Sequence, residues 1–322
     1  MARPSIDVRQ DQEDNPNANK RRKINDKIWR GIFIASGIIS ALMIVVIIIF
    51  VSAKGVSPFL SNYEHARQSV GKFLTGMTWR PDVGEGVYGV AFIIVNTLVS
   101  ALIAAAISFP IAVLTALFIV KIAPKRLREP MQIVVELLAA IPSVVYGVFA
   151  ASKITTLVES IAGFFGVSTF GGKSLMSVSL LLAIMIFPTI TSMSINAIFA
   201  VDKNLELGSL ALGASRTQTN FKVVLTSAKS GIFAGLVLGL GRAFGEATAV
   251  SMVAGNSQIG INLNPFAPTR TLTSTMLSGL KETTGVDYDI RFSVGIVLMV
   301  IILITNLLIQ IVKRKIGGGT NA

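Results

Sequence analysis

The stretch SGIFAGLVLGLGRAFGEATAVSMVAG, residues 230–255, is the segment that decides the fold of this chain. It is long enough and apolar enough to cross a bilayer, yet Arg242 and Glu246 lie near its middle, one helical turn apart. Each charge at that depth costs roughly 2.5–3.5 kcal/mol on insertion scales, so a charge kept there is expected to pair, face water or meet a ligand. This pair is therefore the first candidate for a functional site.

The composition of the whole chain agrees with that segment. Of 322 residues, 52% are hydrophobic and 14% are charged, and the mean hydropathy is +0.68. A soluble domain of this composition would expose far too much apolar surface, so we expect an integral membrane protein. Cysteine is absent and His65 is the single histidine, which excludes a disulfide framework and thiolate metal sites. We expect no metal and no cofactor.

Six apolar segments are long enough to span a membrane, which predicts an all-α polytopic fold. They cover residues 31–53, 87–120, 131–152, 175–200, 230–255 and 292–312. We interpret the second as one long helix bent at Pro110. The predicted organisation is a disordered basic cytoplasmic tail without a signal peptide, an N-terminal transmembrane helix that acts as a signal anchor, an outer loop, a membrane-embedded core with a cytoplasmic loop, and a flexible C-terminus. These parts cover residues 1–30, 31–53, 54–86, 87–316 with 201–229, and 317–322.

The distribution of basic residues orients the spans. With six spans, both termini and the loops 121–128 and 201–229 fall on one side, and that side carries 19 Lys and Arg residues against 9 on the other. Cytoplasmic loops carry such an excess, so both termini are predicted to be cytoplasmic. The sequence pI near 10.1 then reflects membrane orientation and lipid contact. Nucleic-acid binding is not expected, because no soluble basic domain presents a patch for it.

The loop 201–230 reads VDKNLELGSLALGASRTQTNFKVVLTSAKS, which is neither apolar enough to span nor polar enough for a simple linker. Leu207 and Leu210 belong to the apolar side of a short amphipathic helix, with Asn204 as its predicted cap and Gly213 at a turn before a second helical piece. Such a helix is expected either to dock a cytoplasmic partner or to rest on lipid headgroups. The pattern alone leaves both open.

This loop resembles the EAA loop of ABC importer permeases, in which Glu-Ala-Ala precedes a glycine by a fixed spacing. Anchored on Gly213, the glutamate position is occupied by Leu207, with Glu206 one residue earlier, and the final proline position is occupied by Thr226. The resemblance implies that this loop couples the chain to an ATPase. The residues to which it assigns coupling are Glu206, Leu207, Gly208, Ser209 and Gly213.

A second resemblance is more specific. The run GLVLGLGRAFGEATAVSMVAGN at 235–256, together with LLAAIPSVVYGVF at 137–149 and the Trp79 and Pro81 element, is similar to the PstC-type permease of the phosphate-specific ABC transporter. The resemblance implies a type I importer (MetI-like) core with one extra N-terminal helix, in the bacterial cytoplasmic (inner) membrane. It also implies a PstA-like permease partner, a PstB-like ATPase dimer, a PstS-like phosphate-binding protein, and phosphate import by alternating access. The chain itself would not be an enzyme.

The charged pair has a physical interpretation of its own. Arginine offers forked donors suited to phosphate, whereas a glutamate repels an anion unless it is paired or protonated. We therefore hypothesise that Glu246 holds Arg242 in the empty pathway and that phosphate competes for it; the simpler interpretation is a structural salt bridge. Gly235/Gly239 and Gly241/Gly245 are expected to allow close helix packing. The alternatives are a permease for sulfate or molybdate and a secondary anion transporter; an enzyme embedded in the membrane is less favoured, because clustered His, Asp or Glu are absent.

Overall fold

The computed structural model describes residues 16–83, 86–258 and 260–317, with only the backbone described for 16–24 and 312–317. Six helices in these residues are long and apolar enough to cross a membrane, which confirms the predicted all-α polytopic fold. They cover Asn25–Phe59, Ala91–Ile122, Ser143–Phe164, Leu175–Phe199, Arg216–Gly245 and Val286–Ile311. The chain divides into two compact units, Met1–Ala53 and Lys54–Ala322.

The described part of the first unit is helical throughout. It belongs to α1, Pro16–Val56, so the predicted disorder of residues 16–30 was wrong. Residues in this segment such as Ala18, Lys20 and Arg21 are strong helix formers, and extending an existing helix avoids the unfavourable nucleation step. Residues 1–15 of the predicted tail lie outside the described residues, as do 318–322 at the C-terminus.

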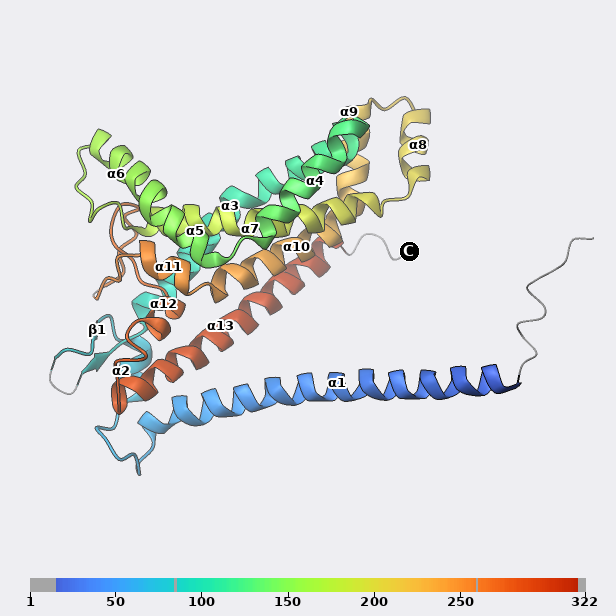
Figure 1. Ribbon diagram of the computed structural model, residues 1–322. Coiled ribbons are helices and arrows are strands. Elements are labelled where there is room, and N and C mark those ends of the chain that lie inside the picture. Colours follow the sequence, from blue (N-terminus) through green and yellow to red (C-terminus); the bar gives the residue numbers. More distant parts are fainter. Residues whose placement is uncertain (1–15, 84–85, 259, 318–322) are drawn as a thin grey trace, which may run out of the picture. The chain divides into compact units, whose positions relative to one another are not determined.

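In the second unit, α7, Leu175–Phe199, is the central helix. It packs against α3, Ala91–Leu117, and α10, Leu225–Gly245 (Figure 1). About two thirds of its apolar window is buried, the largest share among the six spans. The π-helical turn η2, Phe118–Ile122, directly follows α3, and Pro110 lies inside α3 without dividing it. The prediction that the second span is one long helix is thereby confirmed.

The third span lies further along the chain than predicted. α4, Lys125–Ala140, ends before Pro142, and the helix that follows consists of α5 (Ser143–Phe149), the π turn η3 (Ala150–Ile154) and α6 (Thr155–Phe164). Ile141 is extended, with ψ 127°, because a residue before proline is disfavoured in the helical region. The predicted bounds 131–152 were therefore wrong: the apolar helix begins after Pro142 and runs to Phe164.

The two ends of the second unit differ. The hairpin end carries η1 (Ser57–Phe59), α2 (Val70–Thr75), the antiparallel strands β1 (Trp79–Arg80) and β2 (Val87–Tyr88), and α12 (Leu272–Leu277). Trp79, Phe92 and Leu272 belong to its buried core. The α8 end carries α8 (Lys203–Ala211), α9 (Arg216–Gln218) and the π turn η4 (Thr219–Val224), which leads into α10. Figure 1 shows α3, α7, α10 and α13, Val286–Gly317, running lengthwise between these ends.

Candidate functional site

The predicted fifth span is interrupted at Glu246. α10 ends at Gly245, Glu246 is extended with φ −75° and ψ 116°, and a second short helix, α11, covers Thr248–Val253. Oε1 of Glu246 accepts a hydrogen bond of 3.0 Å from the backbone N–H of Ala249. The backbone carbonyl of Glu246 accepts one of 2.7 Å from Thr273 Oγ1. A carboxylate at the start of a helix satisfies an unpaired N–H and meets the positive end of the helix dipole. Glu246 therefore fixes the break between α10 and α11.

Arg242 lies in the last turn of α10 and is partly buried. Its Nη1 donates to Thr189 Oγ1 on α7 at 3.3 Å, and in the described part of the chain it forms no ion pair with Glu246. The expectation of an i, i+4 pair was wrong because the helix ends before Glu246, which removes the geometry that stacks residues four apart. The two candidates are neighbours along the chain with different partners.

The glycines of α10 occupy two different faces. A Cβ on Gly231 would lie 2.5 Å from Ala197 Cβ, and one on Gly235 would lie 2.8 Å from Met193 Cβ, so this face lies directly on α7. Gly239 continues the face, and the predicted packing role of Gly235/Gly239 is confirmed. Gly241 and Gly245 have open space where a Cβ would be. No described part of this chain packs against them, so their predicted packing role stays a prediction.

Four of the five coupling residues predicted from the sequence lie on the short helix α8, and Gly213 lies in the turn that follows it. Glu206 forms an ion pair with Lys121 of η2, and Ser209 Oγ lies 3.0 Å from Thr219 Oγ1 of η4. Leu207 is 62% exposed, and Gly208 is exposed as well. Gly213 has φ +84°, a conformation that glycine adopts without strain. The predicted turn and second helical piece are thus confirmed.

The cap of α8 differs from the predicted one. Asp202, rather than Asn204, caps the helix by accepting a hydrogen bond of 2.9 Å from the backbone N–H of Asn204. Aspartate is as good a cap as asparagine, and the helix begins two residues earlier than the pattern suggested.

Two arginines at the hairpin end are buried, which was not predicted from the sequence. Arg270 is 7% exposed and donates at 2.8 Å to the carbonyls of both Ser257 and Asn256. Burial, and the nearby charge of Arg291, lower its pKa to about 10. Arg291 is 4% exposed, with Asp287 at 3.4 Å. The i, i+4 spacing of Asp287 and Arg291 was a usable signal, whereas nothing in the sequence marks Arg270. Both arginines attach loops to this end of the unit.

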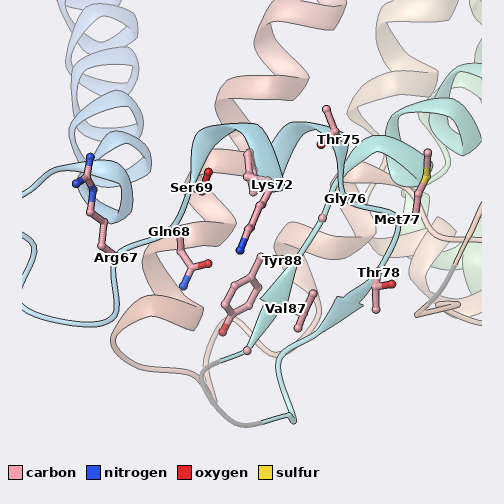
Figure 2. A pocket seen from close by; sticks show the side chains of 13 residues that line it. Arg67, Gln68, Ser69, Lys72, Thr75, Gly76, Met77, Thr78, Val87 and Tyr88 are labelled. Carbon is pink, nitrogen blue, oxygen red and sulfur yellow. The ribbon is translucent and has the colours of Figure 1, made fainter.

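A pocket of about 610 Å³ opens at the hairpin end. Figure 2 shows Lys72 of α2 and Tyr88 of β2 on neighbouring walls. Two cationic residues, Arg67 and Lys72, line it, and the described lining contains no carboxylate. Burial, followed by the charge of Asp287, raises the pKa of Tyr88 to about 12. The pocket lies at the end of the unit opposite to α8 (Figure 1).

The comparisons with known proteins agree with this architecture. A family model described as "binding-protein-dependent transport system inner membrane component" matches residues 94–318. The probable ABC transporter permease protein YqgH of Bacillus subtilis (strain 168) is 36% identical over 300 residues, covering 92% of this chain and 94% of that protein.

Two further relatives carry the description "phosphate transport system permease protein". PstC of Haemophilus influenzae is 29% identical over 291 residues, covering 86% of this chain and 91% of that protein. PstC 1 of Mycobacterium tuberculosis is 34% identical over 277 residues, covering 76% and 82%.

Two solved structures share the fold at low identity. A chain of a bacterial alginate ABC transporter superposes with a TM-score of 0.59 at 17% identity, covering 92% of this chain and 97% of that chain. A chain of the inward-facing MetNI methionine ABC transporter gives 0.52 at 18% identity, covering 70% and 94%. At this identity the likenesses show the fold, and together with the family match they confirm the predicted MetI-like importer core.

Proposed function

Because the chain belongs to the family of binding-protein-dependent transport system inner membrane components, we propose that it is a permease subunit of an ATP-driven importer of inorganic phosphate. Support for phosphate comes from relatives named as phosphate permeases that cover most of the chain. Each of those relatives is named as a transport-system permease. The expected reaction is movement of the anion without chemical change.

The observation that carries the proposal is the environment of Arg242. It lies within a membrane span, uses Thr189 as a hydrogen-bond partner, and has no carboxylate at ion-pair distance in the described residues. A guanidinium has five N–H donors in a planar fork, so donors remain for an oxyanion. An intramembrane charge without a charged partner is most simply explained by a charged ligand that passes it.

The role of Glu246 in the site differs from the one expected from the sequence. Its carboxylate is engaged by the backbone of α11, so its charge is partly neutralised by the helix terminus. We assign it to translocation as the residue that holds the break beside Arg242. The anion then meets a cation whose position is set by α7 and by the end of α10.

The expected partners follow from the family and from the two ends of the unit. A homologous PstA-like permease would complete the pathway, and a PstS-like binding protein would deliver phosphate to the hairpin end, where Arg67 and Lys72 line a pocket. A PstB-like ATPase dimer would bind the α8 end. The ion pair of Lys121 and Glu206 joins the basic loops 121–128 and 201–229 at that end. Because cytoplasmic loops carry an excess of Lys and Arg, this supports placing the α8 end and both termini in the cytoplasm.

The test is phosphate uptake by the complete complex in proteoliposomes, with Arg242→Gln compared with Arg126→Gln. Arg126 is exposed at the start of α4, so the control removes an equal charge outside the proposed site. Loss of a charge-assisted hydrogen bond worth about 1.5–3 kcal/mol predicts at least a tenfold lower uptake for Arg242→Gln alone. Parental uptake by Arg242→Gln would refute the assignment of Arg242.

The same vesicles separate the competing functions. Competition by sulfate or molybdate, with phosphate ineffective, would identify another oxyanion as the substrate. Uptake that persists without any ATPase subunit would identify a secondary transporter.

A further inference from the structure

α8 contacts the rest of the chain through polar side chains. Of its nine residues, only Glu206 and Ser209 are partly buried, and they share one face at i, i+3. Leu207 is 62% exposed, and Gly208 is exposed as well. The exposed residues of α8 are therefore available to a partner, whereas its inward face is held by polar contacts.

Each polar contact leads to a different span. Glu206 pairs with Lys121, in the π turn η2 that directly follows α3. Ser209 contacts Thr219, the first residue of the π turn η4 that leads directly into α10. π turns are rare and occur mostly where a helix has a functional role. α8 is thus connected to both helices that flank α7, and one of these carries Arg242.

The ion pair is the stronger of the two contacts. The side chains of Lys121 and Glu206 are only 17% and 22% exposed, so water and salt screen their attraction less than at an open surface. The end of α3 is also well anchored. Arg128 donates to the carbonyls of Ile119 at 3.1 Å and Val120 at 2.7 Å. A force applied to Glu206 therefore acts on a rigid junction of α3 and α4.

We propose that the ion pair of Glu206 and Lys121 transmits the movement of α8 to α3, so that these two side chains are positioning residues for coupling. The inference rests on the proposed function, in which an ATPase moves α8. In this arrangement the acidic residue of the EAA-like loop acts within the chain, and the exposed residues of α8 face the ATPase. Breaking the pair leaves α8 attached to α10 while α3 no longer follows it.

The experiment measures ATP hydrolysis and phosphate uptake together in proteoliposomes of the complete complex. Glu206→Gln and Lys121→Met are expected to hydrolyse ATP but to import at least about fivefold less phosphate per ATP, a typical size for a coupling energy. The exchanged pair, Glu206→Lys with Lys121→Glu, is expected to recover most of the ratio. Glu159→Gln, which removes an exposed carboxylate on α6 outside the α8 end, is the matched control and should keep the parental ratio.

The outcomes separate this inference from the proposed function. A parental ratio in both single variants, or an assembled exchanged pair no better than the single variants, would overturn the inference alone. Uptake by the parental complex without ATPase subunits would overturn both. Should a single variant fail to assemble, Lys121→Arg, which keeps the charge, must retain the parental ratio, and Glu206→Asp, whose shorter side chain moves the carboxylate away from Lys121, must lower it.

Discussion

The close contact between α10 and α7 allows a graded prediction from alanine substitutions. The Cβ added at Gly231 would lie 2.5 Å from Ala197 Cβ, and the one added at Gly235 would lie 2.8 Å from Met193 Cβ. Optimal carbon contacts are about 3.5–4.0 Å, so Gly231→Ala requires the helices to separate by roughly 1 Å. At Gly239 the nearest atom is Ile190 Cγ1 at 2.9 Å, which a rotation of that side chain can move.

These distances set the expected order of stability. Overpacking costs about 1–3 kcal/mol, while replacing glycine by alanine inside a helix returns about 0.5–1 kcal/mol. Gly231→Ala should therefore lose about 1–2 kcal/mol, Gly235→Ala somewhat less, and Gly239→Ala the least. Gly241→Ala meets open space and should be neutral or stabilising.

The assay is thermal unfolding of the purified chain in one detergent at a fixed heating rate. A change of 1 kcal/mol shifts the Tm by about 2–4 °C in proteins of 150–250 residues, and by somewhat less in a longer chain. Gly241→Ala is the matched control, since it adds the same methyl group to the same helix. Equal Tm shifts for Gly231→Ala and Gly241→Ala would refute the assigned packing face.

Three further predictions concern the break, the buried arginine and the hairpin end. Glu246→Ala should lower the stability by about 1 kcal/mol because an N–H of α11 loses its acceptor, while Glu246→Gln keeps it; equal Tm values in the same thermal assay would contradict the capping role. Arg270→Met should increase hydrogen exchange of residues 255–258, whose carbonyls lose charged donors; unchanged exchange there would show that the arginine does not hold the loop. Because the pKa of Tyr88 is raised to about 12, the unfolded chain releases its proton first above pH 10, so stability falls between pH 10 and 12. Tyr88→Phe should weaken this fall in Tm, and an identical pH profile would refute it.

The sequence alone determined the number of spans and their approximate positions. Segments such as 175–200 and 87–120 are readable because the requirement for about 20 apolar residues is local and applies to each helix separately. The sequence also located α8, since the turn at Gly213 depends on a single residue type. The packing of Gly235 and Gly239 was also predictable from local sequence, because small residues four apart share a helix face.

Tertiary structure decided where the helices break and which charges meet. The sequence around Glu246 has a helical pattern, but the helix ends before this residue. Its carboxylate accepts a hydrogen bond from the backbone N–H of Ala249, and its backbone carbonyl accepts one from Thr273 of a distant segment. Glu206 and Lys121 are separated by 85 positions, so no periodicity connects them. An apolar segment long enough to span is set by neighbouring residues in the chain, whereas a helix break or an ion pair depends on groups that only the folded chain brings together.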